Sequence, residues 1–296
     1  MTDNQQKTVT IVLPCLNEEQ PLGELLPRIT ATVPHAEVIV VDDGSIDQSS
    51  EVAARHGARV VRHPYRMGNG AAIKAGARAA TGSVIVFMDA DGQHNPADIP
   101  RLLAKLDEGY AMAVGARHAR SHASLGRKVA NLFFNRLASL MTGFPINDLT
   151  SGFRAVHAKQ FRRFLYLLPN GFSCPTTSTM AFFRSGYPVA YVPIEVRQRR
   201  GSSNISPLRD GIRFSVIILK VGALFSPMRL FLPISAALFA GGISYYLYTY
   251  IQSDRFTNMG LLLIISALFT FLIGLLSEQV SSLHYRDAEP RNRDVP

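Results

Sequence analysis

The fold of this chain is decided by one stretch of sequence, Val84-Ile85-Val86-Phe87-Met88-Asp89-Ala90-Asp91-Gly92-Gln93. Its five leading apolar residues predict a strand buried on both faces, as in a parallel sheet. Ligands of open α/β sheets bind just beyond the carboxyl ends of strands, where this strand ends on two carboxylates. Alternate residues of an extended segment share a face, so Asp89 and Asp91 can converge on one cation, and oxygen ligands suit Mg²⁺ or Mn²⁺. Asp and Gly are also ordinary in solvated turns, so the stretch alone leaves both interpretations open.

Strands and helices alternate through the first 120 residues. Strands are expected at 9–13, 37–41, 58–62 and 84–88, and helices at 21–33, 49–56 and 71–80. This alternation predicts βαβ units and a parallel sheet. Polar pairs follow three of the strands, at Asn17/Glu18, Asp42/Asp43 and Asp89/Asp91. Because the carboxyl ends of parallel strands share one edge of a sheet, the three pairs predict a single site. The sequence has neither G-x-G-x-x-G after the first strand nor a Walker lysine motif, so a nucleotide would be held in another way.

The second part of the chain is strongly basic. The net charge is −4 over residues 1–100, +14 over 101–230 and −1 over 231–296. This distribution predicts an anionic partner, which could be nucleic acid, a phosphorylated substrate or an anionic membrane surface. The two cysteines, Cys15 and Cys174, have no metal-site spacing and fit a reducing compartment.

Further basic and polar residues follow the predicted site. A strand at 110–115 leads to Arg117, and an amphipathic helix at 124–142 contains Arg127 and Asn131. Asp148 begins a loop into a strand, and a helix is expected from about Pro175. A strand at 188–196 precedes the basic, glycine-containing loop 197–204, which is suited to phosphate contacts or is a solvated turn.

The last third of the chain has the composition of membrane helices. Residues 230–253 and 256–277 contain no charged side chain, and each run is long enough to cross a hydrocarbon core of roughly 30 Å. We expect a transmembrane hairpin over 229–284, with spans at about 230–251 and 259–280; the alternative is a pair of buried core helices. Arginines cluster on the sides of the hairpin next to both chain termini, which predicts cytosolic termini.

These observations divide the chain into four parts. Residues 1–206 are expected to form a cytosolic catalytic domain, and 207–228 an interfacial juxtamembrane helix, whose alternative is a core helix of the globular domain. The hairpin at 229–284 and a cytosolic tail at 285–296 follow. Basic residues adjoin the membrane segment and tryptophan is absent, which disfavours nucleic acid as the partner.

Taken in order, the motifs resemble those of one enzyme family. VTIVLPCLNEE, VIVVDDGSIDQS, GNGAAIKAGARAATGSVIVFMDADGQHNP, DLTSGFRA and RGSSN are similar to the motifs of family 2 glycosyltransferases with a GT-A fold. The most similar subgroup is the polyprenyl-phosphate (dolichyl- or undecaprenyl-phosphate) glycosyltransferases, which also have C-terminal membrane helices. The resemblance covers about residues 8–284. It implies an α/β fold, with a Rossmann-like, mostly parallel sheet flanked by helices, and a C-terminal two-helix hairpin.

The resemblance also implies roles for particular residues. Those implied to bind the nucleotide-sugar are Pro14, Leu16, Glu18, Asp43, Asp89, Ala90, Asp91, Gln93, Arg199, Arg200 and Ser203. Those implied to bind the acceptor phosphate are Arg117, Arg127 and Asn131. Asp89, Asp91 and Gln93 are implied to hold the metal ion, and Asp89, Asp91 and Arg117 to be catalytic. Asp148 is the polar residue whose position in the family motif best fits a general base, and the alternative is a structural role in the loop. Asn204 replaces the usual lysine of the RGSSN loop, and CPTTS follows NGFS without the acidic residue often found there.

The implied reaction is an inverting, single-displacement transfer of a sugar from a UDP- or GDP-sugar to a polyprenyl phosphate. Mg²⁺ or Mn²⁺ would neutralise the charge that builds on the leaving diphosphate. A lipid monophosphate has a second pKa of about 6 and is largely dianionic at neutral pH, so it can attack without a general base. The enzyme would be an integral protein of the cell inner membrane and a possible homo-oligomer. The alternatives are a transferase acting on a glycolipid or polysaccharide, and a non-catalytic membrane scaffold.

Overall fold

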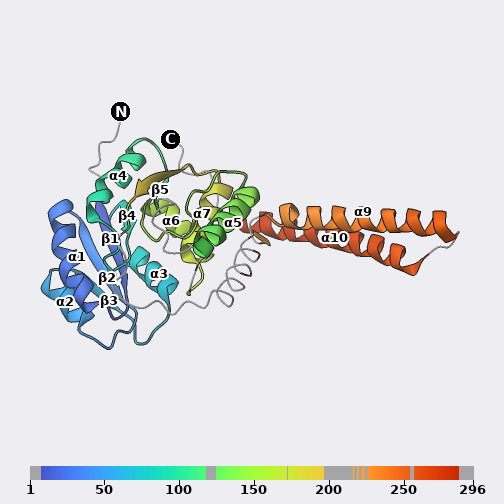
Figure 1. Cartoon of the computed structure of the whole chain (residues 1–296). Helices are drawn as coiled ribbons and strands as arrows, with labels where there is room; N and C mark the ends of the chain where they lie inside the picture. The colour runs from blue at the N-terminus through green and yellow to red at the C-terminus, as the bar shows by residue number, and fades with distance from the viewer. Residues whose placement is uncertain are drawn as a thin grey trace. The chain divides into compact units, whose positions relative to one another are not determined.

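The computed structural model describes residues 8–117, 125–171, 173–196, 216, 219, 222–223, 226–253 and 257–286, and no side chains at 125–131, 133 and 284–286. It divides into two compact units (Figure 1). The first comprises residues up to 136 together with 145–210, and the second comprises 137–144 together with the chain from 211 onward. The interfacial helix expected at 207–228 falls mostly outside the described residues, as does the tail expected at 285–296. The bounds expected for the four parts of the chain stay predictions.

A seven-stranded mixed sheet forms the centre of the first unit (Figure 1). Its strands are β1 (Val9–Cys15), β2 (Glu37–Asp42), β3 (Arg59–Arg62), β4 (Val84–Phe87), β5 (Met112–Arg117), β6 (Arg154–His157) and β7 (Val189–Ile194), in the order β3-β2-β1-β4-β6-β5-β7. The strands β1 to β4 pair in parallel, as the alternation of strands and helices predicts. Strand β6 runs antiparallel between β4 and β5, an insertion that the sequence pattern did not predict.

Two layers of helices cover this sheet. One layer contains α1 (Glu19–Thr32), α2 (Ser49–Arg55), the short 3₁₀ helix η1 (Pro96–Asp98) and α4 (Ile99–Asp107), and the other contains α3 (Asn69–Ala79), α6 (Ala158–Arg163) and α7 (Cys174–Arg184). Helix α5 (Leu125–Thr142) spans both units. Helix α3 approaches the sheet closely at Gly76, where a Cβ atom would lie 2.2 Å from Val12 Cγ1.

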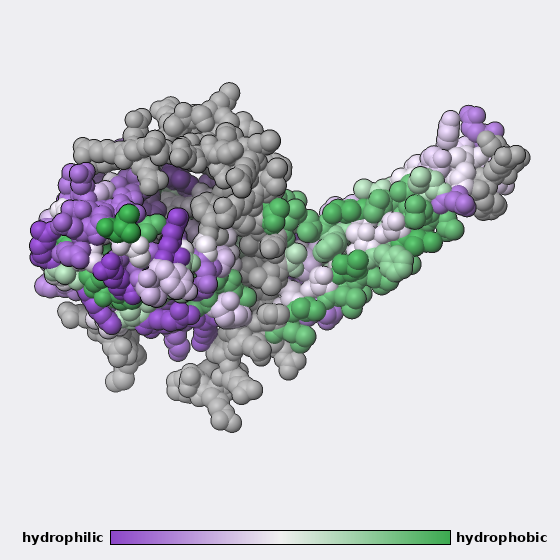
Figure 2. Space-filling view, turned by 90° about the horizontal axis from the view of Figure 1, so that it is seen from below, coloured by the Kyte–Doolittle hydropathy of each residue, from purple (hydrophilic) through white to green (hydrophobic). Residues whose placement is uncertain are grey.

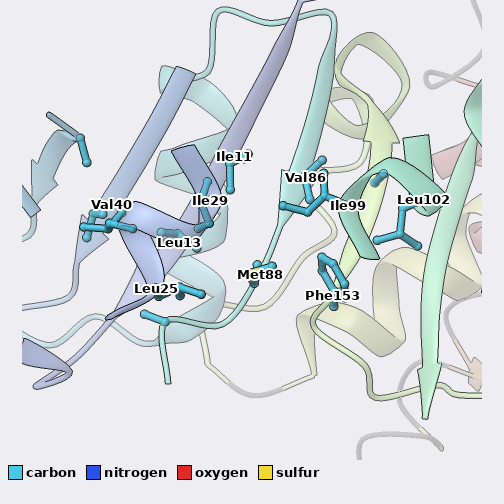
Figure 3. Close-up of a cluster of buried hydrophobic side chains, with 14 of the residues drawn as sticks. Ile11, Leu13, Leu25, Ile29, Val40, Val86, Met88, Ile99, Leu102 and Phe153 are labelled. Atoms are coloured by element: carbon cyan, nitrogen blue, oxygen red, sulfur yellow. The ribbon is translucent and has the colours of Figure 1, made fainter. Parts of the chain in front are cut away.

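A hydrophobic core lies between the sheet and the helix layer that contains α1 and α4. Figure 3 shows Leu25 and Ile29 of α1 over Ile11 and Leu13 of β1, side chains that are almost fully buried. All four residues of β4 are buried, with at most 2% exposure, as expected for a central strand covered on both faces. Strand β4 therefore fixes the backbone from which the Asp89–Gln93 segment begins.

The second unit contains two long apolar helices, α9 (Pro227–Ser253) and α10 (Asn258–Arg286), which pack against each other. Each has 26 residues apolar enough to cross a membrane, and only 11% and 17% of the most apolar window of each helix are buried. Hydrophobic side chains make up most of the described surface of this hairpin in Figure 2, and the hydrophilic residues on it lie mainly toward its far end. Buried core helices would not expose apolar surface of this length, so membrane association is the consistent interpretation.

The base of the hairpin is joined by polar contacts. Glu278 of α10 accepts a hydrogen bond of 3.2 Å from the backbone N–H of Met228 in the first turn of α9. The Arg229 guanidinium donates to the carbonyl oxygens of Leu140 and Met141 at the C-terminal end of α5. Cations stabilise the negative end of a helix and carboxylates the positive end, so both charged side chains stabilise helix ends.

Candidate active site

Asp89 is the first carboxylate after β4, and its side chain is 41% exposed. Its Oδ2 atom lies 3.7 Å from Nε2 of His94, a buried histidine whose ring packs against Phe153. Burial alone would raise the pKa of Asp89. The contact with His94 and the positive charges of Arg154 and Arg117 outweigh burial and hold that pKa below its ordinary value. Asp89 is therefore an ionised, open carboxylate at neutral pH.

The segment that follows Asp89 continues as a tight turn. Gly92 has a φ of 72°, and the backbone N–H of Gln93 donates to Asp91 Oδ1 over 3.1 Å. Asp91 and Gln93 are both partly exposed, and Ala90 is buried. The described residues contain no group of three or more His, Cys, Asp or Glu side chains arranged for a metal ion. Two carboxylates and an amide nevertheless fit Mg²⁺ or Mn²⁺, because such ions commonly take one or two carboxylates and complete their coordination with substrate phosphates.

Arg117, at the carboxyl end of β5, forms a two-pronged ion pair with Asp148. Its Nε and Nη2 atoms donate to the two carboxylate oxygens over 2.8 and 2.9 Å, and Nη2 also donates to Thr150 Oγ1 over 2.5 Å. Its side chain is 28% exposed and that of Asp148 is 8% exposed. The geometry fixes the guanidinium plane. The cation predicted to meet the acceptor phosphate is thus held rigidly and reaches solvent in part.

Asp148 is occupied by donors on both oxygens. The Oδ2 atom also accepts the backbone N–H of Arg117, and Oδ1 accepts the N–H groups of Thr150 and Ser151. Burial would raise the pKa of Asp148, but the bonds and charge of Arg117 and the backbone donors hold it below its ordinary value. A carboxylate with a lowered pKa and filled lone pairs is a weak proton acceptor. The geometry therefore favours the structural role for Asp148 over the base role.

The ends of β1 and β2 meet at the same edge of the sheet, since Cys15 pairs with Asp42. Asn17 adopts a left-handed conformation (φ 56°) and links the two following loops: its N–H donates to Ser45 Oγ, and its side-chain oxygen accepts the N–H of Ile46. The N–H of Glu18 donates to Ser49 Oγ. The predicted nucleotide residues Pro14, Leu16 and Glu18 lie on this edge and are partly exposed.

Asp43 is buried and organises the next loop. One carboxylate oxygen accepts the N–H of Met67 and contacts His63 Nδ1, and the other accepts the N–H of Gly68, all at 2.8 Å. These bonds shape the start of α3, where the N–H groups of Gly70 and Ala71 donate to carbonyl oxygens of the 170–171 loop. In the structure, Asp43 holds the loop that leads into α3. Its contact with a nucleotide stays a prediction.

Arg154 is a site residue for which the sequence reasoning assigned no role. It is 2% exposed, and its Nη1 donates to Pro175 O, Ser178 Oγ and Thr179 Oγ1 over 3.0, 2.7 and 3.2 Å. Its Nη2 donates to the carbonyl oxygen of Ser151. No carboxylate in the described part of the chain forms an ion pair with it. Burial lowers its pKa, yet a guanidinium stays charged at neutral pH, and its charge contributes to the ionisation of Asp89.

Family models match two parts of the chain. The model described as glycosyl transferase family 2 matches residues 10–166, which include the sheet edge described above. The chain is a family 2 glycosyltransferase. A second model, described as the GtrB C-terminal hairpin, matches residues 226–283 of this glycosyltransferase, which contain α9 and most of α10. The enzyme class, the α/β sheet with flanking helices and the C-terminal hairpin expected from the sequence are thereby confirmed.

Two relatives of the glycosyltransferase have names that describe transfer involving a lipid phosphate. The dolichyl-phosphate hexose transferase of Haloferax volcanii is 31% identical over 75% of this chain and 96% of its own. The undecaprenyl-phosphate 4-deoxy-4-formamido-L-arabinose transferase of Salmonella paratyphi A is 27% identical over 97% of this chain and 92% of its own. A crystal structure of glucosyl-3-phosphoglycerate synthase from Mycobacterium tuberculosis with Mn²⁺ and UDP-glucose has a TM-score of 0.60 and 27% identity, covering 73% of this chain and 79% of its own.

Several predicted site residues of the glycosyltransferase lie outside the described residues. Arg199, Arg200 and Ser203 belong to the undescribed segment 197–215, and the side chains of Arg127 and Asn131 are not described although their backbone belongs to α5. Their assignments stay predictions. Among the remaining residues, the structure brings Arg117 and Asp148 into contact and orders Asp89 and Asp91 at the end of β4. The structure also places His94, Gly152 and Arg154 at the site, and the sequence motifs had implied no role for these three residues.

Proposed function

We propose that this glycosyltransferase transfers a sugar from a nucleoside-diphosphate sugar to a polyprenyl phosphate in the membrane. The main support is that an ionised carboxylate site after β4 and a fixed arginine at the end of β5 belong to the same sheet in a chain that also has an apolar hairpin. The names of the two lipid-phosphate relatives support the acceptor class. The UDP-glucose and Mn²⁺ of the structural relative support a nucleotide-sugar donor and a divalent cation.

The donor would lie along the carboxyl edge of β1, β2 and β4. Pro14, Leu16, Glu18 and Asp43 would contact the nucleoside, and Ala90 would adjoin the diphosphate. Asp89, Asp91 and Gln93 would hold Mg²⁺ or Mn²⁺, which when bound neutralises the charge of the leaving diphosphate. The loop residues Arg199, Arg200 and Ser203 would close over the donor.

The acceptor phosphate would be positioned by Arg117, with Arg127 and Asn131 of α5. One phosphate oxygen forms a bond to the anomeric carbon while the bond from that carbon to the diphosphate oxygen breaks, and the nucleoside diphosphate leaves with the electron pair. No proton needs to move, because the acceptor is largely dianionic at neutral pH. A single displacement of this kind inverts the anomeric configuration. Asp148 acts in this scheme by fixing Arg117, and the scheme needs no side-chain base.

The same proposal includes the location of the enzyme. The catalytic unit and both termini would lie in the cytosol, with the hairpin in the cell inner membrane, because basic residues flank the hairpin on the side of the termini. The nucleotide-sugar is a charged, water-soluble donor. A catalytic unit on the cytosolic face would meet this donor in the aqueous phase and the polyprenyl phosphate at the membrane surface.

The experiment is a donor panel with the full-length protein. Purified enzyme in detergent micelles is incubated with undecaprenyl phosphate, Mg²⁺ and radiolabelled UDP- and GDP-sugars, one at a time, and label is counted in the organic phase. We expect one donor to label the lipid fraction and the product anomer to be inverted by NMR. Absence of lipid label with every common donor would contradict the proposal. Label in an added glycolipid or polysaccharide alone would support the other transferase class.

A further inference from the structure

Gly152 lies directly against the Asp89 carboxylate. A Cβ atom on Gly152 would lie 2.8 Å from Asp89 Oδ2, 3.0 Å from Oδ1 and 3.1 Å from Cγ. Real Cβ atoms essentially never approach another heavy atom within 3.0 Å, so a side chain here would force a shift. The backbone of Gly152 is not in the left-handed region that favours glycine. The requirement for glycine therefore comes from the carboxylate beside it.

The backbone around Gly152 has little freedom to move away. On one side, Ser151 donates its N–H to Asp148 Oδ1 over 3.1 Å, and its carbonyl oxygen accepts from the buried Arg154. On the other side, Phe153 is fully buried, and its carbonyl oxygen accepts the N–H of Gly115 over 2.9 Å. Figure 3 shows the Phe153 ring in the core beside Met88. An added methyl group would therefore displace Asp89 more readily than the loop.

Asp89 is constrained by a second neighbour. Its Oδ2 atom, the atom nearest to the Gly152 position, is also the atom 3.7 Å from His94 Nε2. The His94 ring is 5% exposed and packs on Phe153 with ring centroids 5.1 Å apart. Phe153, which packs on His94, is also the residue next to Gly152 in the chain. A methyl group at residue 152 would push the carboxylate away from the position in which Oδ2 lies 3.7 Å from His94 Nε2.

We propose that Gly152 is a positioning residue for the cation site, because its bare Cα allows the Asp148–Gly152 loop to fix the orientation of the Asp89 carboxylate. The proposal rests on the proposed function in one respect, which is that Asp89 is taken as a ligand of the divalent ion. The contact itself does not depend on that role. Two measurements separate the contact from its consequence.

The contact is tested by a double-mutant cycle on thermal stability, without metal. The variants are Gly152→Ala, Asp89→Ala and the double variant. We expect Gly152→Ala to lower the melting temperature of the wild type, and to lower that of Asp89→Ala by less than half as much, because the obstructing carboxylate is gone. Should Gly152→Ala alone fail to fold, a folded double variant gives the same result. Equal losses in both backgrounds, or a double variant that also fails to fold, would overturn the proposal.

The consequence is tested by Mn²⁺ binding in the presence of UDP, followed by electron paramagnetic resonance. We expect folded Gly152→Ala to bind Mn²⁺ at least tenfold more weakly, with UDP affinity in the absence of metal within twofold of wild type. The matched control is Gly23→Ala in α1, where the nearest atom to a new Cβ is Val52 Cγ1 at 3.9 Å, and it should leave Mn²⁺ affinity unchanged. Unchanged Mn²⁺ affinity in folded Gly152→Ala would overturn the proposal. Thermal coupling in an enzyme whose wild type binds no divalent ion would overturn the metal role of Asp89 instead.

Discussion

Replacing Asp148 by Asn separates the two roles that this carboxylate could have. Every acceptor position of Asp148 faces a donor: Oδ2 faces the N–H and Nε of Arg117, and Oδ1 faces Nη2 of Arg117 and the N–H groups of Thr150 and Ser151. An asparagine NH₂ group would meet a donor in either orientation. The variant therefore loses the ion pair and leaves Arg117 partly buried without its hydrogen-bonded carboxylate.

The expected loss of stability is large. Breaking a buried ion pair by neutralising one partner costs about 3 to 5 kcal/mol, and the 28% exposure of Arg117 places this pair at about 3 kcal/mol. For a unit of this size that corresponds to a fall of about 6 to 12 °C in melting temperature. Unfolding can be followed with a thiol-reactive fluorophore, because Cys15 and Cys174 are both free and buried. The control Glu51→Gln changes an exposed carboxylate and should shift the melting temperature by no more than about 2 °C.

The pH dependence of this loss has a defined sign. The folded-state pKa of Asp148 lies below its ordinary value, so its contribution is complete above the unfolded pKa of about 3.9 and is lost as the pH falls through the folded pKa. The difference between wild type and Asp148→Asn should therefore be constant near neutral pH and shrink below about pH 4. A variant with wild-type stability that still loses all transfer would refute this reasoning and favour a base role.

Three further changes test other parts of the site and the hairpin. Asp91→Asn should abolish transfer and leave the melting temperature within about 2 °C of wild type, so retained transfer would refute the metal assignment. Asp43→Asn should lower the free energy of unfolding by about 1 to 3 kcal/mol, because the N–H groups of Met67 and Gly68 lose a charged acceptor. It should also raise the KM for the nucleotide-sugar donor, and an unchanged KM would exclude Asp43 from donor binding. Glu278→Ala should cost about 1 kcal/mol, seen as a lower melting temperature of the purified protein, and an unchanged value would show that the first turn of α9 needs no cap.

The sequence was informative where the signal is local. The run Val84–Phe87 has only apolar residues and became a central strand with almost no exposure. The charge-free stretches from residue 230 onward became two apolar helices, because helix length and hydropathy are properties of contiguous residues. The polar pairs after β1 and β2 met at one edge because parallel pairing places them there.

The sequence was uninformative about features that depend on residues far apart in the chain. Strand β6 has only four residues, Arg154–His157, and runs antiparallel because β4 and β5 both pair with it, which no local pattern indicates. In the sequence, Asp148 is only a polar residue in a loop. Its role becomes visible in the structure, where Arg117, 31 residues earlier in the chain, donates to both of its carboxylate oxygens. The contact between Gly152 and Asp89 joins the loop before β6 to the loop after β4, so a glycine in the motif could not be distinguished from an ordinary turn glycine.

If a lipid phosphate oxygen attacks the sugar, as we propose, the enzyme must distinguish a polyprenyl phosphate from the corresponding alcohol. Undecaprenyl phosphate and undecaprenol are offered to the full-length enzyme in identical micelles, with the active donor and Mg²⁺, and the lipid products are identified by mass and by ³¹P NMR. We expect a sugar phosphodiester from the monophosphate and no product from the alcohol. Transfer to the alcohol at a comparable rate would require a general base and would refute direct attack by the phosphate.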